Sequence, residues 1–217
     1  MYRIEKWRKV QQKFIVLGVL MLITSLPAMA AATAGEKASA VIMRFQASLI
    51  HAMKNAKQLG FKGRYQILDP AVKISHNLPF IAQFTLGPYW SRLNVKQQAE
   101  FVHTFSHLTI ATYAAEFNGY SGEQFKVTSV HVVAGNRVIV ETELLGSKGN
   151  KDAVLDYLLI HSPQGWRIVN IVANGVSDLA LKRAQYTAIM RKSGFNVLIH
   201  DLAIKIKAMS SAHKAAA

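Results

Sequence analysis

Few residues of this chain stand in arrangements that could hold a metal ion. His103 and His107 are four residues apart in an apolar-periodic segment, with Glu100 one turn earlier, and this spacing on a helix can ligate a divalent cation. Helical geometry turns these side chains away from the apolar stripe that contains Phe101 and Phe105. Because the spacing places no third ligand, we predict an ordinary exposed helix face, with no metal and no cofactor.

The other possible catalytic groups are equally sparse. The run Gly119–Gly122 resembles a nucleophile elbow, but Glu123 stands where that motif needs glycine, and the run joins a helix to a strand, the reverse of the required order. Glu141 and Glu143 share one face of a predicted strand and are expected to face water beside basic neighbours. The chain contains no cysteine, which excludes thiolate chemistry and disulfides. We therefore predict no catalytic residues and no enzyme.

Length and composition describe the scaffold that carries these residues. The chain has 217 residues, of which 51% are hydrophobic and 18% charged, so it is long and apolar enough for one domain with a sizeable core. Its 26 lysines and arginines exceed its 12 aspartates and glutamates, a formal net charge of +14. So large a basic excess on so apolar a chain needs an explanation from location and partner.

The N-terminus predicts export. A basic start is followed by the apolar run Phe14–Leu26, then Pro27, then the small-residue cleavage pattern Ala28–Ala30, which together form a signal peptide. An uncleaved inner-membrane anchor is the alternative, but the apolar run is shorter than the roughly 20 residues that span a bilayer. We predict a signal peptide over residues 1–30, a single domain over 31–209 and a flexible tail over 210–217.

Export changes the meaning of the charge. Residues 1–30 contain five basic side chains and one acidic side chain, so the exported chain keeps a net charge of +10. No dense basic cluster with interleaved aromatics follows, which argues against nucleic acid. Anionic lipid headgroups and acidic proteins are the expected partners. A basic surface that only aids solubility is the alternative.

Apolar residues at three- and four-residue intervals predict most of the helices. Asn94 with Gln97 is close to a capping box, Ser177 is a second N-cap, and Asp69–Pro70 is typical of a helix start. Gly60 and Gly63 are expected to interrupt the first helical region. The predicted helices cover residues 36–57, 69–76, 79–86, 94–117, 177–191 and 196–209.

Between residues 125 and 173 the apolar period changes to two. Glycine-rich turns divide this region into strands over residues 125–133, 137–145, 153–161 and 166–173. Helices on either side of a four-strand antiparallel meander define one α+β domain. The last two strands are apolar on both faces, which requires cover on both. Helices packed above and below are one explanation, and a curved sheet around an apolar cavity is the other.

Three stretches resemble the toluene-tolerance or MlaC family of periplasmic lipid-binding proteins. They are LGPYWSRLNVKQQAEFVHTF (residues 86–105), ATYAAEFNGYSGEQFKV (111–127) and LDYLLIHSPQGWRIVNIVANGVSDLALKRAQY (155–186). The run TYAAEFNGYSGEQF and the run LGFKGRYQIL (59–68) are most similar to the hopanoid-associated, HpnM-like branch. The resemblance extends from about residue 36 to residue 207. It contains no catalytic signature.

The resemblance implies helices around a curved sheet, a nuclear-transport-factor-like cone with a deep apolar pocket. It implies a monomeric periplasmic carrier that encloses the tails of a hopanoid or phospholipid. The carrier would move them between an inner-membrane transporter complex and an outer-membrane complex. One position departs from the family pattern, because Asn170 stands where an aspartate is expected after Trp166. We expect its hydrogen bond to be kept without the charge.

These expectations select eight residues for the pocket. The wall is predicted to contain Phe84, Trp90, Phe105, Leu158, Ile168 and Val172, with Tyr113 and Tyr157 nearer a polar mouth. The choice of strand face depends on the phase of each strand, since a shift of one residue exchanges the two faces. Two other functions remain open. One is a small enzyme using Asp156 or Asp178 as its base, and the other is an envelope accessory protein that binds no ligand.

Overall fold

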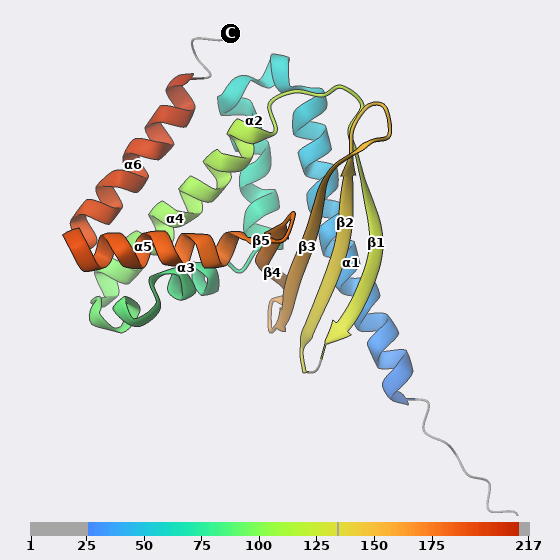
Figure 1. Ribbon diagram of the computed structural model, residues 1–217, viewed down its shortest axis with the longest axis horizontal. Helices are drawn as coiled ribbons and strands as arrows, with labels where there is room; N and C mark the ends of the chain where they lie inside the picture. Colours follow the sequence, from blue (N-terminus) through green and yellow to red (C-terminus); the bar gives the residue numbers. More distant parts are fainter. Residues whose placement is uncertain (1–25, 134, 213–217) are drawn as a thin grey trace, which may run out of the picture.

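The computed structural model describes residues 26–133 and 135–212, and these residues form an α+β fold (Figure 1). The helices are α1 (Leu26–Lys54), α2 (Ala56–Ser75), α3 (Leu78–Leu86), the 3-10 helix η1 (Gly87–Arg92), α4 (Val95–Glu116), α5 (Asp178–Ser193) and α6 (Phe195–Ala212). The strands are β1 (Gln124–Val133), β2 (Arg137–Leu145), β3 (Lys151–Ser162), β4 (Gly165–Ala173) and β5 (Val176–Ser177). The α+β prediction is confirmed.

The two predicted chain ends fall partly outside this description. Most of the predicted signal peptide, residues 1–25, lies outside the described residues, and α1 begins at Leu26. At the other end, α6 continues through residues 210–212, the first part of the predicted flexible tail. The Ser210 hydroxyl donates to the carbonyl oxygen of Lys207 at 2.8 Å. Residues 213–217 lie outside the described residues.

The strands form one antiparallel sheet in chain order, from β1 to β5. The predicted count of four strands is wrong, because β5 adds a short edge strand that pairs with the end of β4. Asn174 and Gly175 join the two with φ angles of 49° and 82°, the pair of positive values that a tight two-residue hairpin requires. The sheet is open, and the cone implied by the resemblance stays a prediction.

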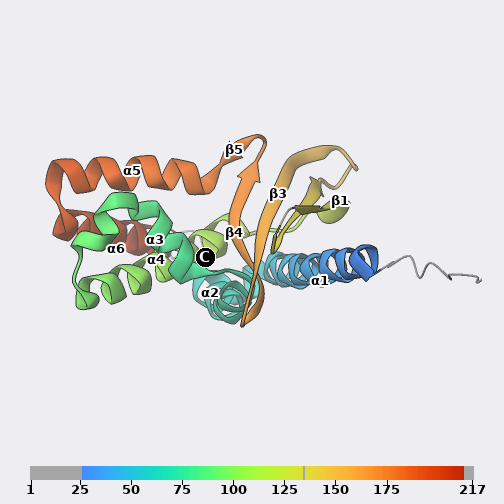
Figure 2. The same cartoon turned by 90° about the horizontal axis from the view of Figure 1, so that it is seen from below.

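One face of the sheet, the inner face, packs against α1. Val138, Val140 and Leu159 lie on this face with no exposed surface. Figures 1 and 2 show α1 running across the sheet, while α3, α4, α5 and α6 gather beside β4. The outer face, which carries Ile139, Leu158 and Ile160, is only half-buried. Cover on both faces was expected for the last two long strands, β3 and β4. Helices α1, α2, α3 and α5 contact β4, whereas the outer face of β3 stays half-buried.

Two helices, α4 and α5, begin at the N-cap residues that the sequence predicts. Asn94 Oδ1 accepts from the Gln97 backbone N–H at 2.9 Å, and Gln97 Oε1 accepts from the Asn94 N–H at 3.1 Å, a complete capping box. Ser177 Oγ accepts from the Ala180 N–H at 3.1 Å and starts α5. These two helices supply the walls of the site described below.

The prediction that a helix begins at Asp69–Pro70 is wrong. Pro70 lies inside α2, and Asp69 forms an ion pair of 2.8 Å with Lys73 instead of capping a helix. The helical path breaks earlier, at Gly60, whose φ of 57° and ψ of −172° are not helical. Gly63 lies within the helix that follows. The left-handed φ is accessible to glycine because it lacks a Cβ atom.

Within residues 26–133 and 135–212, no helix is both long enough and apolar enough to cross a bilayer.

Candidate functional site

The structure places a narrow cavity where the sheet meets the helical group. This β4 cavity has a volume of about 30 Å³ and lies between β4, the end of α2, and helices α3, α4 and α5. Three predicted pocket residues, Phe105, Tyr113 and Ile168, line it. The remaining lining residues are His76, Ile81, Thr109, Val169, Asn170, Ile171, Asp178 and Leu179. The predicted juxtaposition of sheet and helices is therefore present, with a small internal space.

The other five predicted residues lie elsewhere. Tyr157 is buried on the inner face, where its hydroxyl accepts from Gln46 Nε2 at 3.4 Å. Phe84 lies on the exposed side of α3, stacked with Phe80 and beneath the Arg183 guanidinium at 4.6 Å. Trp90 is half-buried in η1. Leu158 and Val172 both lie on the outer face.

An irregularity in β4 separates two residues that were assigned to one face. The register shifts so that Leu159 pairs with Ile168 and Leu158 pairs with Asn170, which leaves Val169 without a direct partner. Such a β-bulge resets the alternation of side chains. Ile168 consequently lies on the inner face and Val172 on the outer face, because strict alternation does not continue through Val169.

A buried polar group forms one wall of the β4 cavity. His76 Nε2 lies 3.1 Å from the Tyr113 hydroxyl, and His76 Nδ1 lies 2.8 Å from Ser75 Oγ. The Phe45 ring meets both His76 and Tyr113 edge-on, with ring centroids 4.9 Å and 5.1 Å apart. These contacts satisfy the polar atoms inside an apolar environment, as buried polar groups require.

Burial keeps this wall uncharged. Desolvation lowers the pKa of His76 to about 3, with a smaller effect of the Lys182 charge in the same direction and an opposing backbone contact with Val72. Desolvation also raises the pKa of Tyr113 well above its ordinary value, so its hydroxyl keeps its proton. At neutral pH the wall is thus a neutral imidazole and a neutral phenol. Sequence reasoning missed His76, because its partner Tyr113 is 37 residues away and no spacing pattern marks the pair.

Charged side chains border the cavity where α4 ends and α5 begins. Asp178 lines the cavity and forms an ion pair with Lys182 one turn later in α5. Burial raises the pKa of Glu116, the Lys182 charge opposes that shift, and Asp178 adds to it. This arrangement balances the opposite charges at the edge of an apolar space.

Asn170 acts as the expected hydrogen-bond acceptor. Its Oδ1 accepts from Ser177 Oγ at 3.0 Å and from the Leu179 backbone N–H at 3.4 Å. These contacts tie β4 to the start of α5 without a carboxylate. An amide can replace a carboxylate here because only its acceptor oxygen is used.

The two candidate bases are placed differently. Asp156 lies on the outer face opposite Glu141, and burial together with the Glu141 charge raises its pKa. Glu141 itself pairs with His131 at 3.2 Å. Asp178 is exposed at the cavity edge and bound to Lys182. The geometry gives neither aspartate a hydrogen bond to a histidine or a nucleophile among the described residues.

The histidines of α4 and the paired glutamates are likewise held by neighbours. His103 and His107 have ring centroids 4.3 Å apart, and His107 Nδ1 lies 2.6 Å from the Tyr65 hydroxyl. His107 is half-buried, which differs from the solvent-facing position expected for it. Glu143 forms an ion pair with Lys151, a basic neighbour of the kind expected beside it.

The chain is similar to proteins of known family. The family profile described as "MlaC protein" matches residues 44–203. A curated relative, "Intermembrane phospholipid transport system binding protein MlaC" of Haemophilus influenzae, is 24% identical over 126 residues, covering 57% of this chain and 59% of the relative. The alignment thus spans about three-fifths of that relative's length.

A solved structure resembles this fold along most of the chain. It is the phospholipid-binding protein of Ralstonia solanacearum in complex with a phospholipid, with a TM-score of 0.71 and 18% identity. The match covers 80% of this chain and 99% of that one, and at this identity it speaks for the fold alone. Because the family profile covers well over half of the residues, the chain belongs to the MlaC family.

Proposed function

We propose that this chain is a periplasmic lipid carrier that encloses lipid tails between β4 and helices α3, α4 and α5. The observation that carries the proposal is the β4 cavity of this MlaC-family chain. Its lining combines six apolar side chains with the neutral His76–Tyr113 pair, Thr109 and Asn170, and the charged Asp178 stands at its exposed edge. An aliphatic tail gains about 0.8 kcal/mol per methylene when it leaves water, so a carrier that crosses an aqueous gap must enclose it. Neutral walls suit that task and require no chemistry.

The size of the cavity makes opening part of this proposal. About 30 Å³ corresponds to the space of a single water molecule, far less than a lipid tail needs. We propose that the helical group moves away from β4 when lipid enters. The links that join β4 to that group include the Asn170 contacts with Ser177 and Leu179 and the hydrogen bond from the Asn77 N–H, at the start of α3, to the Ile168 carbonyl oxygen.

Two lipid classes fit this partly apolar lining. The sequence resemblance to the hopanoid-associated branch favours a pentacyclic triterpenoid. The Haemophilus influenzae relative, a phospholipid transport protein by name, and the phospholipid complex from Ralstonia solanacearum favour a phospholipid. We propose a phospholipid or hopanoid cargo, passed between an inner-membrane transporter complex and an outer-membrane complex by a monomer. The signal peptide over residues 1–30 belongs to the same proposal.

The direct test is the lipid content of the exported protein. Native mass spectrometry with lipid extraction should show about one lipid per chain and identify its class. Ile171→Trp should fill the cavity and remove the lipid, because Ile171 lines it on the inner side of β4. Val172→Trp is the matched control, since this neighbouring, half-buried residue lies on the outer face.

Two results would contradict the carrier proposal. Wild-type protein free of lipid would favour an accessory protein without a ligand. Equal lipid content in wild type, Ile171→Trp and Val172→Trp, with all three folded by circular dichroism, would exclude the β4 cavity as the binding site.

A further inference from the structure

A second hollow lies apart from the β4 cavity and shares no lining residue with it. This basic hollow has a volume of about 640 Å³, within the range of small-ligand sites. It is formed where α1 meets α2 and where α4 leads into β1, at the upper end of the molecule in Figure 1. Its lining residues are Met53, Lys54, Ala56, Lys57, Gly60, Phe61, Arg64, Asn118, Gly119 and Tyr120.

The charges in this hollow all have one sign. Lys54, Lys57 and Arg64 contribute three cations, and the lining contains no aspartate or glutamate. These three residues take part in none of the ion pairs formed among residues 26–133 and 135–212. Lys54 Nζ lies 5.2 Å from the centre of the Tyr120 ring, a contact that holds the ammonium group without neutralising it. The hollow therefore concentrates positive charge.

Arg64 gives the strongest indication that this hollow can bind an anion. Only 3% of this residue is exposed. Its Nε donates to the carbonyl oxygen of Ala114 at 2.8 Å and its Nη1 donates to that of Ala56 at 3.0 Å, while its Nη2 has no hydrogen-bond partner. A buried cation without a counter-charge and with an unmet donor is costly, and an anion would offset both costs.

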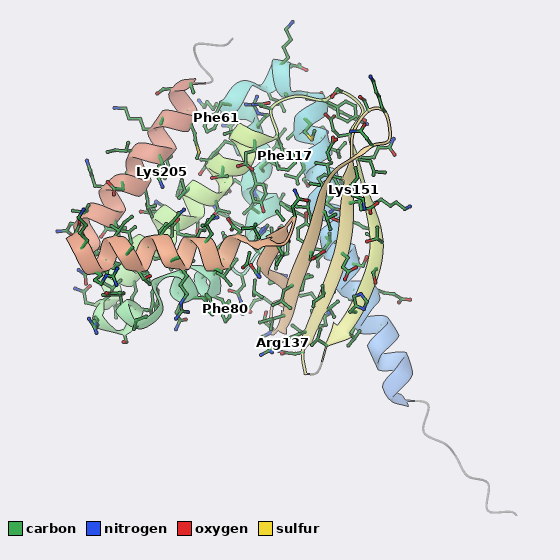
Figure 3. The ribbon with its side chains drawn as sticks, in the orientation of Figure 1. Phe61, Phe80, Phe117, Arg137, Lys151 and Lys205 are labelled. Atoms are coloured by element: carbon green, nitrogen blue, oxygen red, sulfur yellow. The ribbon has the colours of Figure 1, made fainter. Side chains whose placement is uncertain are left out.

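The remaining lining favours an amphiphilic ligand. Met53 and Ala56 are buried, and Phe61 adds a half-buried aromatic ring. At Gly60 the helix breaks, and a Cβ atom built there would meet nothing within 4 Å, so the hollow stays open beside the kink. In Figure 3, Phe61 lies at the end of the molecule opposite to Phe80. Cations beside apolar and aromatic groups suit an anion that is attached to an aliphatic body.

We propose that the basic hollow binds the phosphate group of a phosphate-bearing amphiphile, with Arg64, Lys54 and Lys57 as its ligands. Guanidinium groups bind phosphate through several parallel N–H donors, and lysine adds mobile charge. The site is distinct from the tail cavity. It rests on the proposed function in one respect, which is that a lipid, rather than free phosphate, brings the phosphate group.

The test uses the full exported chain and two probes. Inorganic phosphate is titrated at constant ionic strength, and vesicles of phosphatidylglycerol and phosphatidylcholine in equal amounts form the second arm. Binding is followed by the NMR shifts of the Gly60, Gly119 and Tyr120 amides. The variant Lys54→Gln/Lys57→Gln is compared with Lys205→Gln/Lys207→Gln, which removes the same charge from exposed positions on α6. Lys205 is labelled in Figure 3.

The proposal expects phosphate to shift the three amides, with affinity lowered about tenfold in Lys54→Gln/Lys57→Gln and unchanged in the α6 variant. Shifts of the same amides by vesicles, reversed by phosphate, identify a lipid headgroup as the source. Shifts by phosphate but not by vesicles identify free phosphate. Arg64→Lys should weaken binding as well, and the lysine pair keeps the test valid if Arg64→Lys fails to fold.

Three results would overturn the proposal. They are unshifted amides at saturating phosphate, equal loss in both double variants, and binding of acetate as strong as that of phosphate, which would indicate a carboxylate-bearing protein partner. Lipid extraction from the same samples separates this outcome from the carrier proposal. Lipid bound in wild type with an unresponsive basic hollow rejects only the phosphate site.

Discussion

The inner face of the sheet and the β4 cavity use the same kinds of residues in different ways. Under α1, Val138, Val140 and Leu159 are completely buried and belong to the same apolar cluster as Ile42 and Phe45. Beside β4, the bulge at Val169 and the polar pair His76–Tyr113 interrupt that packing and leave a small space. Close packing by one long helix makes a rigid support. The boundary between β4 and the helical group is packed less completely, so a ligand can enter there and move the helices away from the strand.

The largest expected effect distinguishes the two faces of β3. Leu159→Asp should abolish cooperative folding, because it buries an unpaired carboxylate under α1 at a cost of several kcal/mol. Leu158→Asp should stay folded and lose about 1 kcal/mol, since Leu158 lies on the half-buried outer face. Circular dichroism melts of both variants make the measurement. Unfolding of both would show that the outer face is also covered.

The next test compares a core residue at the cavity with a true wall residue. Phe105 lines the cavity, but it is also 1% exposed and packs against Phe101 and Tyr186 with ring centroids 6.1 Å and 6.4 Å away. Phe105→Ala should therefore cost about 3–5 kcal/mol, as for a core phenylalanine. Ile171→Ala, at a half-buried position on the cavity, should cost about 1 kcal/mol. Urea unfolding of lipid-free protein measures both, and equal losses would remove the distinction between core and wall.

The third test measures how the free energy of unfolding depends on pH, which reports on His76 in the wall of the β4 cavity. Desolvation lowers the pKa of His76 to about 3 in the folded chain, against about 6.5 in the unfolded chain. The unfolded chain binds the extra proton between these values, so the contribution of His76 is present above pH 6.5 and is lost as the pH falls towards 3. The slope is about 1.4 kcal/mol per pH unit, or about 2 kcal/mol between pH 6.5 and pH 5.

His76→Phe should flatten that slope in denaturant titrations at several pH values. His200→Gln, at an exposed histidine of α6, is the control and should leave the slope in place. A slope that survives in His76→Phe would show that another group produces it.

The smallest effect concerns the link between β4 and α5. Asn170→Ala removes the acceptor for Ser177 Oγ and the Leu179 N–H and should lower the free energy of unfolding by about 1–2 kcal/mol. Asn170→Asp keeps the acceptor and should lose less. If the helical group opens from β4 during lipid entry, Asn170→Ala should also speed lipid exchange measured with a fluorescent lipid. An unchanged exchange rate would separate this link from the opening.

Much of the fold is readable from local signals. The capping box at Asn94 and Gln97, the N-cap at Ser177 and the alternation along β2 predict elements that the structure confirms. Each depends on residues a few positions apart, whose interactions form wherever the rest of the chain lies. The resemblance to the MlaC family is also carried by the sequence, and the family profile confirms it.

The site was less predictable than the fold. Of the eight predicted pocket residues, three line the β4 cavity, because the others were placed by assuming strict alternation or by aromatic character alone. The bulge at Val169 arises from pairing with β3, and no local residue type announces it. Asp69–Pro70 has the composition of a helix start, but the helix that begins after Gly60 continues through it. Tertiary packing overrides such local preferences.

The sequence by itself determined most of the helices and strands, the excess of basic charge, and the family. Tertiary structure alone decided which polar groups far apart in the chain meet. His76 reaches Tyr113 across 37 residues, and Arg64 reaches the Ala114 carbonyl across 50. Such pairs form only after α2 and α4 pack together, because their energy depends on burial and on atoms that the chain brings together last. For that reason the neutral His76–Tyr113 wall and the unpartnered Arg64 Nη2 can be recognised only in the folded structure, while most of the elements that hold them can be predicted from the sequence.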